Sequence, residues 1–160
     1  MSEVCNVIVC GGRTYTDKAK IYQALDLVMV RVEQEEGLTL RVLFGDAKGV
    51  DAIACTWACE RRKLFRVYAA DWEHEGKAAG PLRNQRMLDQ NLVWLVVAFQ
   101  GGRGTADMVR RAKAKAIQVW FPATSPTDDL PPWILSAEGP TPYPDETSPA
   151  GDQTSCDVSS

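Results

Sequence analysis

The amino-acid sequence predicts an α/β fold in which a parallel β-sheet of about five strands is flanked by helices. Two observations support this prediction. Short continuous apolar runs alternate with longer segments whose apolar residues recur at helical spacing, and the connections between them are short. Continuous apolar runs are typical of parallel strands, because helices cover both faces of such a sheet.

Five apolar runs are predicted to be strands. The first covers residues 4–10, is rich in Val and Ile, and stops at Gly11-Gly12. The others cover residues 40–44, 65–69, 92–99 and 117–121. Their regular separation by helical segments indicates a Rossmann-like arrangement, in which each strand is followed by a helix.

Four segments are predicted to be helices. Asp17 is a good N-cap for the first, which runs to about Glu36 and ends at Gly37. The second covers residues 50–62. The third follows a polar loop and opens at Pro81, where a missing N–H costs nothing, and the fourth covers residues 106–116.

A change in composition divides the chain into a domain of residues 1–121 and a tail of residues 122–160. Eight of the nine prolines lie in the tail, which has seven acids and neither Lys nor Arg. Such a segment cannot bury enough apolar surface to fold, so we expect it to be mostly disordered. Of the 21 acids, 14 then remain against 18 basic residues in 1–121, a net charge of +4.

This composition excludes several classes of protein. No stretch approaches the ~20 apolar residues of a membrane span, and the first residues do not resemble a secretory signal, so we expect a cytoplasmic protein without a membrane partner. Cys55 and Cys59 lie one helical turn apart without the neighbouring ligands of a zinc site, and we expect no metal and no cofactor. The mild positive charge suits a small anion better than nucleic acid.

Three glycine clusters follow predicted strands: Gly11-Gly12, Gly45 with Gly49, and Gly101-Gly102-Gly104. Ligands of parallel sheets bind at the carboxyl ends of strands, where glycine permits close approach and a helix N-terminus attracts phosphate. The alternative is that the clusters are only tight turns. The neighbouring cationic and hydroxyl side chains favour a phosphate site; they are Arg13, Thr14, Lys48, Arg103 and Thr105. The dinucleotide and Walker A glycine patterns are absent, which argues against NAD dehydrogenases and P-loop NTPases.

Four segments carry a resemblance to a known family: residues 9–13, 45–52, 79–84 and 101–108. They resemble the YspA/YpsA-like branch of the SLOG superfamily, which also includes Smf/DprA and the "Lonely guy" phosphoribohydrolases. The resemblance covers about residues 4–121. It implies a Rossmannoid fold that binds nucleotides or nucleotide derivatives.

The "Lonely guy" enzymes cleave the N-glycosidic bond of a nucleoside 5′-monophosphate, and part of their motif is present. Arg83 matches the catalytic arginine, Met87 the methionine, and Gly101–Thr105 the phosphate-binding turn. Met108 stands where that family has its catalytic glutamate. Cleavage needs a carboxylate to stabilise an oxocarbenium-like centre, so the hydrolase mechanism does not transfer directly to this chain.

Several single residues have two interpretations. Arg83 is a phosphate anchor or a partner in a surface salt bridge. Asp46, Asp51 and Asp107 lie near helix N-termini, where an acid offsets the helix dipole or holds ribose hydroxyls. Trp72 stacks on a base or caps the core.

We therefore expect a module that senses or sequesters a phosphate-bearing nucleotide or nucleotide-derived small molecule. One alternative is an N-glycosidase or phosphoribohydrolase-like hydrolase, with Arg83, Asp107 and Asp46 as catalytic candidates and Asp51 as a further candidate for the carboxylate. The other is a DprA-like single-stranded DNA-binding accessory protein. Oligomerisation is left open. The predicted ligand-binding residues are Gly11, Gly12, Arg13, Thr14, Gly45, Asp46, Lys48, Gly49, Asp51, Arg83, Asn84, Gly101, Gly102, Arg103, Gly104 and Thr105.

Overall fold

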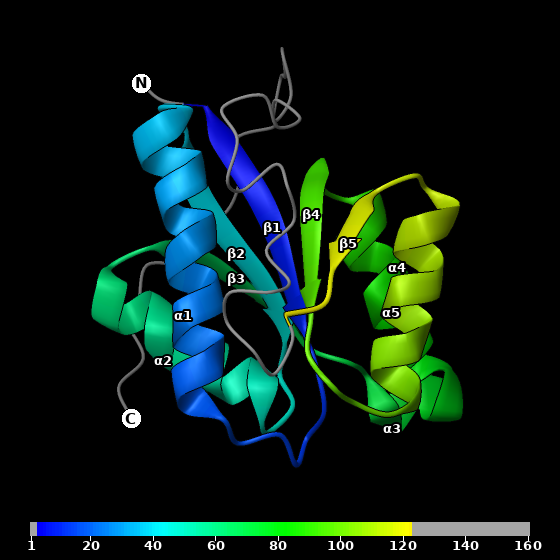
Figure 1. Ribbon diagram of the computed structural model, residues 1–160. Coiled ribbons are helices and arrows are strands. Elements are labelled where there is room, and N and C mark those ends of the chain that lie inside the picture. Colours follow the sequence, from blue (N-terminus) through cyan, green and yellow to red (C-terminus); the bar gives the residue numbers. More distant parts are fainter. Residues whose placement is uncertain (1–2, 123–160) are drawn as a thin grey trace.

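A five-stranded, wholly parallel sheet forms the centre of the computed structural model, which describes residues 3–122. The strand order is β3-β2-β1-β4-β5 (Figure 1). The strands are β1 (Val4–Cys10), β2 (Thr39–Gly45), β3 (Leu64–Tyr68), β4 (Val93–Ala98) and β5 (Gln118–Trp120). The predicted Rossmann-like α/β fold is confirmed, whereas the predicted tail lies outside the described residues, apart from its first residue.

Helices cover both faces of the sheet. α1 and α2 pack on one face, and α4 and α5 on the other (Figure 1). The helices are α1 (Lys18–Met29), η1 (Val30–Glu35, a π-helical continuation), α2 (Val50–Arg61), α3 (Trp72–Glu75), η2 (Gly76–Ala78, a 3₁₀ turn), α4 (Ala79–Asp89) and α5 (Arg103–Ala114). None of the helices among the described residues is long and apolar enough to cross a bilayer.

α1 begins and is buried as its sequence predicts. The Asp17 carboxylate accepts the backbone N–H of Lys20 at 3.1 Å and so caps the helix. Ile21, Leu25 and Val28 recur at helical spacing and are fully buried against the sheet.

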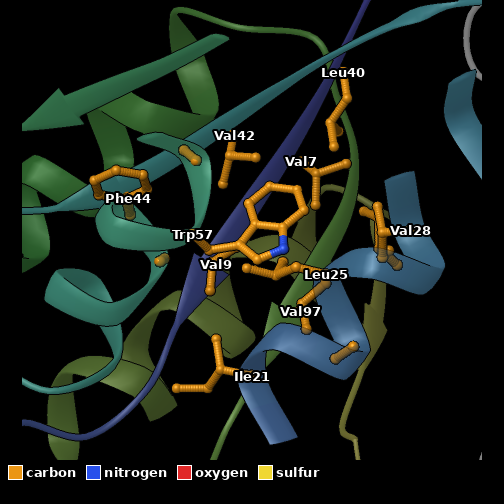
Figure 2. Packing of buried hydrophobic residues seen from close by; sticks show 14 of the residues in the cluster. Val7, Val9, Ile21, Leu25, Val28, Leu40, Val42, Phe44, Trp57 and Val97 are labelled. Carbon is orange, nitrogen blue, oxygen red and sulfur yellow. The ribbon is translucent and has the colours of Figure 1, made fainter. Parts of the chain in front are cut away.

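Trp57 of α2 is the largest fully buried side chain in the main core. It packs against Val7, Val42 and Leu25, which come from two strands and from α1 (Figure 2). The indole Nε1 donates to Asp26 Oδ1 at 2.9 Å, which satisfies the buried polar atom of this ring. α1 and α2 are thereby joined over the same face of β1 and β2.

A smaller core lies on the opposite face of the sheet. Ile8 and Leu43 face it, because successive residues of a strand point to opposite faces. Met87 of α4 and Met108 of α5 fill the space above them, and Met108 is only 1% exposed. This core fixes the positions of α4 and α5. The N-terminal halves of these two helices carry several of the predicted ligand-binding residues.

Two segments differ from the sequence-based expectation. The expected polar loop before Pro81 contains the short helix α3, because the Asp71 carboxylate accepts the N–H of His74 at 3.2 Å and starts a turn. α4 then begins at Ala79, two residues before Pro81. α5 begins at Arg103 rather than at residue 106, so Gly102 is its N-cap.

Candidate functional site

The carboxyl ends of β1 and β4 meet at the point where the strand order reverses, which is where open α/β sheets bind ligands. Backbone hydrogen bonds tie the following loops together. Gly12 N donates to Gln100 O at 2.9 Å, and Phe99 N donates to Cys10 O at 2.9 Å. Val50 N donates to Gly12 O at 3.3 Å and adds the start of α2. The three glycine clusters therefore lie in one place.

A cavity of about 950 Å³ opens at this edge of the sheet. Its volume lies near the upper end of the range for small-molecule sites, about 300–1,000 Å³. The predicted ligand-binding residues that line it are Gly11, Gly12, Arg13, Thr14, Gly45, Asp51, Arg83, Asn84, Gly101, Gly102, Arg103, Gly104 and Thr105. Asp46, Lys48 and Gly49 were also predicted, but they are not among its lining residues.

Some of these glycines are required by the packing of the protein itself. Gly49 has φ +73°, and a Cβ there would lie 2.6 Å from the carbonyl oxygen of Arg13. A Cβ on Gly101 would lie 2.6 Å from Gly12 N. Real Cβ atoms do not approach so closely, so these two glycines let one loop pack on another and need no ligand to explain them.

Gly102 and Gly104 are different, because a Cβ on either would meet no atom within 4 Å. Neither residue has a positive φ. The fold therefore does not require glycine at these two positions, and both of them line the cavity. Open space above them is available to a ligand.

The two helix N-termini at the site differ in how they are capped. At α2, Val50 N binds Gly12 O, and the carboxylate of Asp51 accepts Ala47 N at 3.2 Å. At α5, Gly102 has no side chain that could cap the first N–H groups. The positive end of the α5 dipole therefore faces the cavity with no acid in the first turn of the helix, which suits an anion.

Arg83 of α4 lies along the end of β2. Its side chain is 14% exposed, and Nη1 donates to Tyr68 O at 3.2 Å and lies 3.6 Å from Asp46 Oδ1. A Cβ on Gly45 would collide with Nη1, so glycine at this position makes room for the guanidinium group. The Asp46 side chain is 46% exposed, and ion pairs to such exposed groups contribute little to stability.

Asn84 connects Arg83 to the first turn of α5. Its Oδ1 accepts from Arg83 Nε at 3.0 Å, and its Nδ2 donates to Gly104 O at 3.2 Å and to Asp107 Oδ2 at 3.0 Å. Asp107 also binds Arg110 and Arg111, at 2.5 and 2.8 Å. Burial opposes the charge of Asp107, but the hydrogen bonds from Arg111 and Asn84 outweigh it and lower the pKa of the carboxyl group. Asp107 thus supports Asn84 as a carboxylate.

Asp51 is a buried acid at the cavity and is only 7% exposed. Burial raises its pKa to about 6, against the opposing effects of the Ala47 hydrogen bond and the charge of Arg83. A raised pKa in a cleft is a recognised property of groups that exchange protons. Of the acids considered from the sequence, Asp51 has both the burial and the pKa that this task requires.

Sequence reasoning missed several residues of the cavity. Tyr15, Thr16 and Asp17 line it, and the Tyr15 ring lies 5.5 Å from the ring of Phe99. They could have been found by extending the predicted loop after β1 to its end. Lys77 and Gln100 also line the cavity, and Lys77 was missed because η2 was not expected. Within residues 3–122, no three His, Cys, Asp or Glu residues are grouped as a metal site would need.

Comparison with known proteins finds relatives in sequence and in structure. The Gene 61 protein of Mycobacterium phage D29 is 36% identical over 120 aligned residues, and the match covers 71% of this chain and 92% of that protein. The crystal structure of DNA processing protein A (DprA) from Streptococcus pneumoniae matches with a TM-score of 0.57 at 18% identity. The match covers 78% of this chain and 52% of DprA, so this chain spans about half the length of DprA.

A second solved structure, the structural-genomics target TM1055, matches with a TM-score of 0.50 at 19% identity. It covers 74% of this chain and 72% of the other. The model of the YspA, cpYpsA-related SLOG family matches residues 5–74, which include the Gly11-Gly12 and Gly45–Gly49 clusters. With the phage relative matched over nearly its whole length, the chain belongs to the YspA, cpYpsA-related SLOG family.

Proposed function

We propose that the domain binds a nucleotide-derived small molecule whose phosphate group lies at the N-terminus of α5. One observation carries this proposal. The cavity at the carboxyl ends of β1 and β4 contains an α5 N-terminus without a side-chain cap, with open space above Gly102 and Gly104. Backbone N–H groups and the helix dipole together favour an anion at such a position.

The side chains around this turn have the right chemistry for a phosphate. Arg13 and Arg103 line the cavity and are exposed, so their guanidinium groups can reach a ligand without first breaking a buried ion pair. Thr105 adds a hydroxyl donor from the first turn of α5. Asn84 holds Gly104 O and thereby orients this turn. Nucleic acid is a less suitable ligand, because residues 1–121 carry only a small positive net charge.

The proposal is tested by isothermal titration with adenosine 5′-monophosphate, ribose 5-phosphate, inorganic phosphate and single-stranded DNA. Gly102→Val fills the open space and should weaken binding of the sugar phosphate and the nucleotide at least tenfold, about 1.4 kcal/mol. The fold should survive, because nothing lies within 4 Å of the new Cβ. Ala106→Val is the matched control, since Ala106 is exposed on α5 and does not line the cavity.

Ala106→Val should leave both affinities unchanged. The assignment is wrong if folded Gly102→Val protein binds the two phosphate ligands as tightly as the unmodified protein does. Tight, salt-dependent binding of DNA alone would instead favour the nucleic-acid hypothesis.

A second candidate function is hydrolysis of the bound nucleotide, and Asp51 is the observation that favours it. Asp46, Asp51 and Asp107 are the candidate carboxylates from the sequence, but Asp107 is engaged by two arginines and Asp46 is outside the cavity lining. Asp51 lines the cavity, and its charge interacts with that of Arg83. If the domain is a hydrolase, it should release free base from a nucleoside monophosphate, and Asp51→Asn should abolish the release while binding persists.

A further inference from the structure

We propose that Trp72 is the surface on which the aromatic base of the ligand stacks. This inference rests on the proposed function and narrows it. The ligand is then a nucleoside phosphate with its base intact rather than a sugar phosphate. Base–aromatic stacking tolerates different bases, so the proposal concerns the class of ligand and not one particular base.

Trp72 exposes a large apolar ring to water, which is unfavourable. The side chain is 49% exposed and belongs to neither core cluster. Of its two sequence-based interpretations, capping the core is therefore wrong. Other large apolar side chains in the described part of the chain are also exposed, including Leu82 and Leu92, but only Trp72 among them lines the cavity. A ligand in the cavity would remove this apolar surface from water.

The ring of Trp72 lies beside α4. Its edge atom Cη2 lies 3.4 Å from where a Cβ on Gly80 would be, which is ordinary van der Waals contact. Gly80 is buried in the first turn of α4, three residues before Arg83. The indole therefore packs on the same helix that positions the guanidinium group of Arg83.

The short helix α3 that carries Trp72 is anchored at both ends. Asp71 caps its start, and Glu75 Oε2 at its end accepts from Arg86 Nη1 of α4 at 3.4 Å. A fixed aromatic ring loses little conformational freedom when a ligand stacks on it, so more of the stacking energy contributes to affinity. Lys77, in the turn after α3, also lines the cavity and brings a donor for the acceptor atoms of a base.

These observations give the cavity two chemically different parts. The part formed by α5 and the glycine loops offers N–H groups, a hydroxyl and guanidinium groups, whereas the part formed by α3 and η2 offers an indole and an amine. A sugar phosphate would satisfy the first part and leave the second exposed to water. A nucleoside phosphate satisfies both.

The experiment compares two probes, adenosine 5′-monophosphate and ribose 5-phosphate, on three proteins by isothermal titration. The unmodified protein should bind the nucleotide about tenfold more tightly than ribose 5-phosphate, as expected for one stacked base. Trp72→Ala should remove this difference and leave the affinity for ribose 5-phosphate unchanged. Leu82→Ala is the control, because Leu82 is 43% exposed on α4 and does not line the cavity.

Tryptophan fluorescence gives a second readout. Nucleotide-dependent quenching that is present in the unmodified protein and lost in Trp72→Phe reports on Trp72, because the other tryptophans are the same in both proteins. Within residues 3–122, the other tryptophans are buried. If both probes bind the unmodified protein equally and Trp72→Ala changes neither affinity, the stacking proposal is wrong and the phosphate site stands. If neither probe binds the unmodified protein, the proposed function itself fails.

Discussion

Gly104→Ala should make the protein more stable and at the same time a poorer binder. Gly104 is the second residue of α5 and is exposed, and the methyl group of an alanine there would meet no atom within 4 Å. Glycine inside a helix costs roughly 0.5–1 kcal/mol relative to alanine, and we take the lower value in a first turn. A gain of about 0.5 kcal/mol should raise the melting temperature of a domain of this size by about 2 °C.

The same methyl group enters the space where we place the phosphate. We therefore expect adenosine 5′-monophosphate to bind at least fivefold more weakly, about 1 kcal/mol, when stability and affinity are measured on the same samples by thermal unfolding and titration. Ala106→Gly is the reverse control on the exposed, cavity-free side of α5, and should lower stability without changing affinity. Increased stability with unchanged affinity in Gly104→Ala would refute a phosphate at this turn.

Buried polar and apolar groups at the site give three further predictions. Burial raises the pKa of Asp51 from 3.8 to about 6 in the fold, so ionisation of this group destabilises the protein as pH rises from about 4 to 6. Asp51→Asn lacks this effect, so its melting temperature minus that of the unmodified protein should increase over this window, by the equivalent of up to about 3 kcal/mol. A difference that does not change with pH would contradict the raised pKa. Asn84→Ala should lower the free energy of unfolding in urea by about 1–3 kcal/mol and weaken phosphate binding, because Gly104 O and Asp107 lose the donor that they share. An unchanged affinity would show that this network does not support the turn. Met108→Glu places a carboxyl group in the smaller core. It should destabilise the protein more at pH 7 than at pH 5, because the buried group is more easily protonated at pH 5. A variant as stable as the unmodified protein at pH 7 would contradict the burial of this position.

Much of the sheet could be predicted from the sequence, because its signals are local. Residues 4–10 are apolar except for Asn6, and the structure has a strand with the same bounds. Asp17 caps α1 as predicted, since an N-cap bond depends only on residues three positions apart. Such features need no knowledge of the rest of the fold.

The start of α5 and the short helix α3 could not be predicted in the same way. Gly102 and Gly104 indicate a turn on propensity alone, yet α5 begins between them because the smaller core holds Met108 and Ala112 against the sheet. Tertiary packing here overrides the weak local preference. α3 has only four residues and no buried side chain, so apolar periodicity gave no sign of it.

For the candidate site, the sequence located the loops but could not assign a task to each glycine. Gly49 and Gly102 look alike in the sequence, since each belongs to a glycine cluster between a predicted strand and a predicted helix. In the structure Gly49 has a positive φ and packs on Arg13 O, whereas Gly102 faces open space. This difference depends on contacts with a loop that is distant in the sequence, so the residues around each glycine do not predict it.

The same limit applies to the acids, and it decides where a reaction should be sought. Asp46, Asp51 and Asp107 are equivalent in the sequence, because each lies near the start of a helix. Their surroundings separate them. The Asp46 side chain is exposed, Asp107 is paired with two arginines and has a lowered pKa, and Asp51 is buried at the cavity with a raised pKa. A carboxylate that is already paired with two arginines gains little by stabilising a developing positive charge, whereas a buried carboxylate with a raised pKa gains more. A test for cleavage of the proposed ligand should therefore begin with Asp51 rather than with the position that Met108 occupies.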